Sequence, residues 1–147
     1  MIKEIRHTQT YKETIDHLGD TLQRLPQVEM PLIHLFAPGV YYREIFMPAG
    51  TLVIGHEHKT EHFNIVLTGR AKVMMDGVIH DIKGPDVFVS PPGTSKILHI
   101  VKDMRWATIH PSDETDIEVL EDILVTKSPS YYKYQAQIEA LIAKEII

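Results

Sequence analysis

The stretch GTLVIGHEHKTEHFNIVLTG, residues 50–69, places three histidines within seven residues, between two short apolar runs. His56 and His58 are two residues apart, so on a β-strand their side chains point to the same face. If the chain turns directly after His58, a strand that begins near His62 runs back beside the first one, and His62 faces the other two. Neutral imidazole is the commonest metal ligand in proteins. The pattern therefore predicts a divalent metal ion held by His56, His58 and His62, with open positions for water or a substrate.

The second strand of this hairpin alternates in a way that supports the prediction. Phe63 and Ile65 fall on one face, whereas His62 and Asn64 fall on the other. We therefore assign Asn64 as a candidate ligand-binding residue beside the histidines. A structural hydrogen bond is the alternative role for its amide.

The sequence around the histidines predicts an all-β domain over residues 28–111. Short apolar runs alternate with turn sequences rich in Pro and Gly, which is typical of a sandwich or a barrel. The Asp76-Gly77 pair predicts a tight hairpin. Strands are predicted at 32–36, 40–46, 51–57, 62–67, 70–75, 78–81, 86–90, 96–101 and 104–110.

Helices are predicted on both sides of this domain. In the segment 1–27, Thr10 and Glu13 fit a capping box, and apolar residues then recur at helical spacing until Pro26. The segment 112–147 predicts a short helix capped by Thr115 and a final helix after Ser130, which packs either on the β domain or on a second subunit. Together these parts are expected to form one domain.

Composition excludes several classes of function. The 147 residues carry a formal net charge of −5 and no cysteine, which excludes disulfides and thiolate metal ligands. Basic residues do not cluster along the sequence, so nucleic acid is not an expected partner. No apolar run approaches the roughly 18 residues of a membrane span, and no secretory signal begins the sequence. A cytoplasmic protein without membrane contact is the expectation.

Two motifs resemble the conserved motifs of the cupin superfamily. The first, G-x5-H-x-H-x3-E-x6-G, matches Gly50, His56, His58 and Gly69, with His62 where the family usually has glutamate. The second matches the run PDVFVSPPG at 85–93, with Lys96 where the family usually has a histidine ligand. The resemblance implies a cupin jelly-roll β-barrel, often dimeric, with a metal ion inside the barrel mouth.

Lys96 is the main departure from this pattern, because an ammonium close to a divalent ion repels it. We expect Lys96 to reach the rim and bind an anionic ligand group; the alternatives are a neutral amine or a site without metal. Arg43 is a second candidate for an anionic group, with a solvent-facing role as its alternative. His110 shares strand parity with Trp106 and is a candidate ligand-binding residue, or it simply ends a strand.

Two classes of function remain open, and the sequence leaves enzyme status undecided. The first is a metal-binding cupin, including a dioxygenase-like enzyme for a small anionic substrate, with Fe, Mn, Ni or Zn as its metal. The second is a non-catalytic cupin that binds or sequesters a small anionic or nucleotide-like metabolite without metal. A third option is a purely structural cupin in a larger assembly, in which the helices form the contacts. The resemblance implies a homodimer.

Overall fold

The computed structural model describes Glu13 and residues 17–21, 27–75 and 77–126. Residues Val28–Thr126 form one compact unit, separate from the segments that flank it. Within the N-terminal segment, residues 17–21 are helical, as the capping box predicts. The final helix predicted after Ser130 lies outside the described residues, so the division at 27 and 111 stays a prediction.

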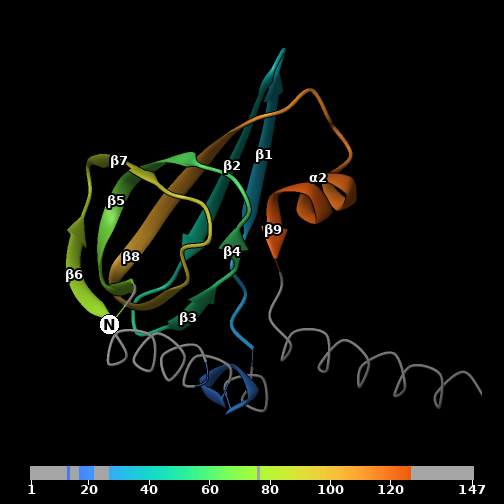
Figure 1. The fold of residues 1–147 in the computed structure, drawn as a ribbon. Helices are drawn as coiled ribbons and strands as arrows, with labels where there is room; N and C mark the ends of the chain where they lie inside the picture. The colour runs from blue at the N-terminus through green and yellow to red at the C-terminus, as the bar shows by residue number, and fades with distance from the viewer. Residues whose placement is uncertain (1–12, 14–16, 22–26, 76, 127–147) are drawn as a thin grey trace, which may run out of the picture. The chain divides into compact units, whose positions relative to one another are not determined.

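The compact unit is mainly antiparallel β-structure (Figure 1). Its large sheet runs in the order β1-β2-β8-β5-β6, with β3 paired to β8 and β7 paired to β5. A second, two-stranded sheet joins β4 to β9. The strands are β1 (Leu32–Ala37), β2 (Val40–Met47), β3 (Leu52–Gly55), β4 (Glu57–His58), β5 (His62–Met75), β6 (Val78–Lys83), β7 (Asp86–Ser90), β8 (Lys96–Pro111) and β9 (Val125–Thr126), and helix α2 spans Ile117–Leu124.

Two pairs of predicted strands merge into two long ones. The segments 62–67 and 70–75 are both part of β5, and the segments 96–101 and 104–110 are both part of β8. The pairing of β5 with β8 shifts register between Val66 and Ala71, which bends the strands without ending them. Gly69 has a φ of 98°, and a Cβ there would collide with the backbone of β8. The glycine thus marks a close approach of two strands, not the predicted turn.

Alternation along β5 sets the buried face of the sheet. His62, Asn64 and Val66 are buried whereas Phe63 is exposed, which confirms the predicted parity. Trp106 is buried at 5% exposure in the same core. The core cluster also contains Met47, Ala71, Val73, Ile82, Leu98, Ile100 and Met104. Side chains of this face therefore share one interior with the candidate site.

A smaller core lies beneath α2. Leu120 and Leu124 of the helix pack on Tyr41 of β2. The helix is capped by Asp116, whose side chain accepts hydrogen bonds from two backbone N–H groups of the first turn, so the cap lies one residue after the predicted Thr115. Lys59 N–H donates to the Leu124 carbonyl at 2.7 Å, which fixes β4 beside the end of the helix. No helix in the described part of the chain is both long and apolar enough to cross a membrane.

Candidate metal centre

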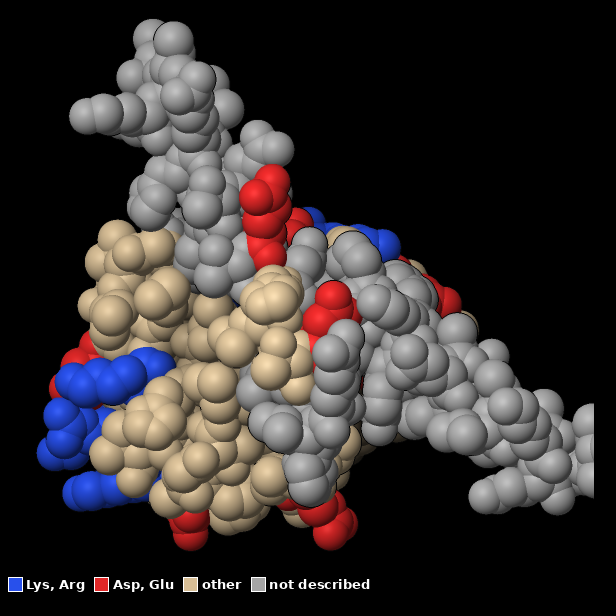
Figure 2. Space-filling model, turned by 90° about the horizontal axis from the view of Figure 1, so that it is seen from below, with Lys and Arg blue, Asp and Glu red and all other residues tan. Residues whose placement is uncertain are grey.

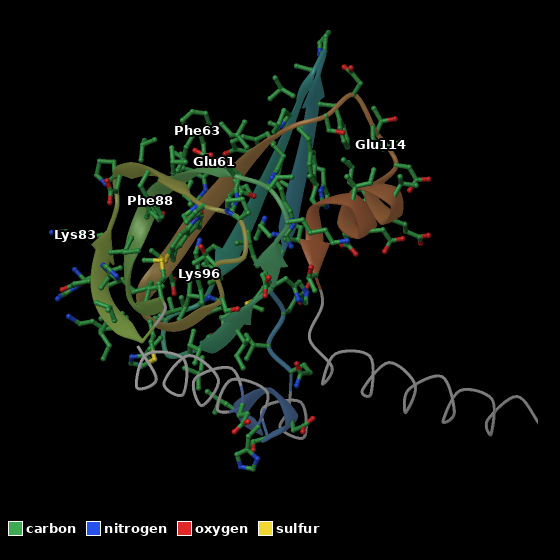
Figure 3. The ribbon with its side chains drawn as sticks, in the orientation of Figure 1. Glu61, Phe63, Lys83, Phe88, Lys96 and Glu114 are labelled. Atoms are coloured by element: carbon green, nitrogen blue, oxygen red, sulfur yellow. The ribbon has the colours of Figure 1, made fainter. Side chains whose placement is uncertain are left out.

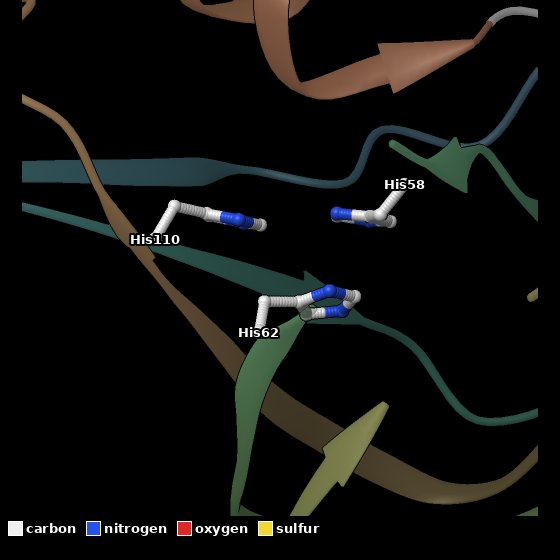
Figure 4. Close-up of side chains that lie close together, drawn as sticks. All are labelled: His58, His62 and His110. Atoms are coloured by element: carbon white, nitrogen blue, oxygen red, sulfur yellow. The ribbon is translucent and has the colours of Figure 1, made fainter. Parts of the chain in front are cut away.

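Three histidines from three separate strands meet on the buried side of the sheet (Figure 4). His58 lies on β4, His62 begins β5 and His110 lies near the end of β8. Their ring centroids are 4.2 Å apart for His58 and His62, 5.1 Å for His58 and His110, and 5.0 Å for His62 and His110. One ligand atom from each lies within 4.8 Å of the others. This spacing allows a shared ion after small side-chain movements.

The group differs from the predicted one, because His110 stands in it and His56 does not. The prediction assumed one regular strand through His56 and His58. In the structure β3 ends at Gly55, and β4 begins at Glu57 in a different sheet. The rule that residues two apart share a face does not hold across such a break. The third histidine of the group comes from β8, where alternation puts Thr108 and His110 on the same buried face as Trp106.

Each of the three histidine rings has a buried nitrogen without a hydrogen-bond partner. Four buried side-chain polar atoms in the described residues have no hydrogen-bond partner: His58 Nδ1, His62 Nε2, His110 Nδ1 and Thr60 Oγ1. Three of the four are ring nitrogens of this one group. Leaving a buried polar atom unpaired costs about 1–3 kcal/mol. One metal ion held between the rings would satisfy all three nitrogens at once.

Hydrogen bonds orient the second ring nitrogens of His62 and His110. His62 Nδ1 lies 2.9 Å from the Thr60 carbonyl, which can only accept, so this nitrogen carries the proton and Nε2 keeps its lone pair. His110 Nε2 lies 3.1 Å from Thr108 Oγ1, and a proton donated there leaves the lone pair on Nδ1. Outer hydrogen bonds of this kind set the tautomer of metal-binding histidines.

Burial and mutual repulsion keep the group neutral. Burial is the main cause that lowers the pKa of His58 to about 2, with further lowering from a charge on His62 or His110. Burial likewise lowers the pKa of His110 to about 4 and lowers the pKa of His62. Neutral rings with free lone pairs are the form that binds metal.

Lys96 lies inside the curve of the sheet and not at the rim (Figure 3). Its Nζ is 3.2 Å from Ser90 Oγ and 3.4 Å from Asn64 Oδ1. The ammonium also lies over the Trp106 ring at 5.3 Å and the Phe88 ring at 5.8 Å. Burial lowers the Lys96 pKa to about 8, so the amine is mostly protonated at neutral pH. The structure therefore places a cation on the same face as the histidines.

Asn64 ties Lys96 to its surroundings. The Asn64 amide donates to Ser90 Oγ at 2.9 Å, and Asn64 Oδ1 accepts from Trp106 Nε1 at 3.0 Å. Because Ser90 pairs with His62 across β5 and β7, this network adjoins the histidine group. Asn64 thus makes the structural hydrogen bonds that were the alternative to ligand binding, and its role toward a ligand stays a prediction.

Arg43 approaches the histidine group from β2. It pairs with Thr108 across β2 and β8, and its charge lowers the pKa of both His58 and His110. Burial lowers the Arg43 pKa, and the carboxylate of Glu121 on α2 acts in the opposite direction. Arg43 is half-buried, and both its role toward an anionic group and its solvent-facing alternative stay predictions.

Comparison with known proteins places this geometry in a family. A model of the AraC-like ligand binding domain matches residues 40–144, more than half of the chain. The chain belongs to this family. A comparison of this chain with curated protein sequences finds no match.

Solved structures show its fold. This chain superposes on the DMSP lyase DddQ from Ruegeria pomeroyi with 20% sequence identity and a TM-score of 0.50. The superposition covers 59% of this chain and 49% of the lyase, so the chain spans about half the length of the lyase. A cupin superfamily protein from Desulfitobacterium hafniense gives 17% identity and a TM-score of 0.50, over 64% of this chain and 87% of that one. At these identities the likeness shows the cupin fold alone, in agreement with the cupin resemblance of the sequence.

Proposed function

We propose that this cupin binds a divalent metal ion through His58, His62 and His110, in a jelly-roll barrel closed around the site. The supporting observation is that each of the three rings presents a buried nitrogen without a hydrogen-bond partner to the same small region. The absence of any cysteine limits the donors to imidazole and oxygen, a set that suits Fe, Mn, Ni or Zn. Three protein ligands leave coordination positions for water or a ligand.

Each residue near the group has a distinct task in this proposal. Thr60 and Thr108 hold the tautomers of His62 and His110. Lys96 and Arg43 provide the positive charge that attracts a small anionic ligand. When bound, the metal would supply Lewis acidity or, as Fe(II), a site for oxygen chemistry. Catalysis by such a site on a small anion is the first candidate function.

Ligand binding without catalysis is the second candidate, and the family match favours it. The family is described as a ligand-binding domain. The half-buried Lys96 and the buried Asn64 would then bind an anionic metabolite without a metal ion, and the histidines would hydrogen-bond it directly. Metal content separates the two candidates.

The decisive experiment measures metal bound per chain in untagged protein, both as purified and after reconstitution. We expect close to one divalent ion per chain, and we expect His58→Ala to abolish its retention. The matched control is His99→Ala, because His99 is exposed on β8 away from the group. Negligible metal in wild-type protein after reconstitution would refute the metal site and leave the second candidate.

The role of Lys96 is tested on the metal-loaded protein, with oxalate as the probe. Lys96→Met should weaken oxalate binding by about tenfold or more, since a charge-assisted contact contributes about 1.5–3 kcal/mol. Metal affinity should not fall, because the variant removes a cation and no ligand. Unchanged oxalate affinity would contradict the assignment of Lys96.

A further inference from the structure

Two half-buried cations near the histidine group have no carboxylate partner in the described part of the chain. The other two arginines of that part, Arg70 and Arg105, each pair with a carboxylate, at 2.7 Å and 2.9 Å. No such ion pair reaches Arg43, and Lys96 donates only to two neutral side-chain oxygens. A charge that is partly withdrawn from water is costly until an opposite charge compensates it. Both side chains are therefore suited to bind anionic groups.

Electrostatic effects agree with this reading of the two cations. Burial is the main cause that lowers the Arg43 pKa, and the charge on Glu121 of α2 opposes it without forming an ion pair with Arg43. For Lys96, burial is the cause that lowers the pKa, with no acidic side chain acting against it. The described chain thus leaves both positive charges largely uncompensated.

The register places the two cations at opposite ends of one cross-strand row. Arg43 on β2 pairs with Thr108 on β8, and Thr108 pairs with Asn64 on β5. Directly paired residues share a face of the sheet. The Lys96 Nζ lies 3.4 Å from Asn64 Oδ1 and 5.8 Å from the ring centre of Phe88, which follows Asn64 in the row on β7. About two strand intervals therefore separate the two cations.

This row runs beside the histidine group. Thr108, in the middle of the row, contacts His110 through the hydrogen bond of 3.1 Å. Burial lowers the pKa of His110 most, and the charges on His62 and Arg43 lower it further. Burial also leads for His62, and Lys96 is the charge that lowers its pKa further. A ligand that reached both cations would thus lie next to the histidines.

The spacing of the row limits the length of such a ligand. Neighbouring strands are about 4.8 Å apart, so the backbones at the two ends of the row are about 10 Å apart. Because side chains stand roughly perpendicular to a sheet, their tips keep a similar spacing. A charge-assisted hydrogen bond of about 2.8 Å at each end leaves about 4 Å between the anionic groups. At about 1.5 Å for each carbon–carbon bond, this distance fits a chain of about four carbon atoms.

Other cations of the described chain offer an anion much less. Figure 2 shows Lys and Arg side chains gathered on one side of the molecule. Lys72, Lys83 and Lys102 are exposed, so water already solvates their charges and screens any contact with an anion. Arg43 and Lys96 differ because both are half-buried and face the histidine group.

We propose that the ligand of this site is a dicarboxylate of about four carbon atoms, with one carboxylate on the Arg43 guanidinium and the other on the Lys96 ammonium. The inference rests on the proposed function, since it names the class of ligand for the site that the histidines define. Arginine binds a carboxylate through two parallel hydrogen bonds, whereas lysine acts as a point charge. A ligand with one anionic group would leave one cation uncompensated.

The test compares succinate with succinamate, in which a neutral amide replaces one carboxylate. Both are titrated by calorimetry into the full chain, in metal-loaded and in metal-free samples. The wild-type chain should bind succinate at least about tenfold more tightly than succinamate, because succinamate lacks one charge-assisted contact. Equal affinities for the two compounds would overturn the proposal.

Variants of Arg43 show whether that preference comes from the row. Arg43→Gln should remove the preference by weakening succinate binding, and Arg43→Lys should retain it. The matched control is Lys102→Gln, which removes an exposed charge from β8 and should keep the wild-type preference. If circular dichroism shows that Arg43→Gln does not fold, Lys96→Met replaces it with the same expected loss. A folded variant of either residue that keeps the full preference would overturn the proposal.

Metal content of the same samples separates this proposal from the proposed function. A chain that retains no metal and still prefers succinate would refute the metal centre and support the dicarboxylate row. A chain that retains metal and binds succinate and succinamate equally would refute the ligand class and leave the metal centre intact.

Discussion

Two polar groups share the buried face of this sheet, and they differ in how their hydrogen bonds are satisfied. Asn64, Ser90, Trp106 and Lys96 bond to one another at 2.9–3.4 Å. In the adjoining histidine group, each ring has a buried nitrogen with no partner. A satisfied network stabilises the fold as it stands, whereas an unsatisfied one lowers the stability of the fold until a ligand supplies the missing partners. The difference separates residues that support the site from residues that bind within it.

The largest expected effect is stabilisation of the histidine group by metal. Saturating Zn²⁺ or Mn²⁺ should raise the free energy of unfolding by about 3–4 kcal/mol at 100–1,000 times the dissociation constant, because only the folded chain assembles the three ligands. Thermal denaturation with metal and with a chelator measures this. His62→Ala should abolish the difference, and a metal-induced shift that survives in this variant would locate binding elsewhere.

The next prediction compares the two groups in metal-free protein. Asn64→Leu should lower the free energy of unfolding by about 2 kcal/mol, because it leaves the buried Trp106 Nε1 without its acceptor and removes one of the two donors to Ser90 Oγ. His58→Leu should cost at least about 1 kcal/mol less, since it removes an unpaired buried nitrogen. Urea denaturation of both variants gives the comparison. Equal losses would mean that the histidines are structural.

Acid should affect the histidine group before it affects the network. The pKa of His110 is about 4 in the folded chain against 6.5 for a free histidine, so between these values the unfolded state binds a proton that the folded state does not. The stability of metal-free protein should therefore fall as the pH drops from 6.5 to 4, and this histidine contribution should be level above 6.5. Urea denaturation of His110→Gln at several pH values should show a smaller slope, and an identical slope would contradict the assigned pKa.

The smallest effect is expected on the exposed face. Asp81 pairs with Arg70 at 2.7 Å and with Lys72 at 2.8 Å, and the three side chains are between 38% and 46% exposed. Water and salt screen such pairs, so Asp81→Asn should change stability least of all these variants. If Asp81→Asn lowered the free energy of unfolding as much as Asn64→Leu does, burial would not explain the difference between the exposed ion pairs and the buried network.

Much of this arrangement follows from periodicity in the sequence. Alternation along β5 predicts that His62 and Asn64 share the buried face, and the cupin motifs predict the fold. The same alternation in β8 groups His110 with Trp106, but it cannot show that the end of β8 meets the start of β5. That contact depends on the β5–β8 register and its bulges, which local pattern does not encode.

His56 shows where alternation along the sequence gives a wrong prediction. Its spacing from His58 suggests a shared face, yet a break between β3 and β4 separates the two residues. Local sequence does not reveal that break, because β4 is defined by its pairing with β9 almost 70 residues later in the chain. Lys96 is a similar case. Its motif position is clear from the sequence, whereas its hydrogen bonds to Ser90 and Asn64 arise only from the folded sheet.

The identity of the third ligand is the most direct test of the metal centre. Untagged His56→Ala and His110→Ala proteins, reconstituted with Co²⁺, would be compared by bound metal per chain and by the visible absorption of the bound ion. We predict that His56→Ala retains one ion with the wild-type spectrum and that His110→Ala loses it. Loss of the ion in His56→Ala with retention in His110→Ala would contradict the centre described above.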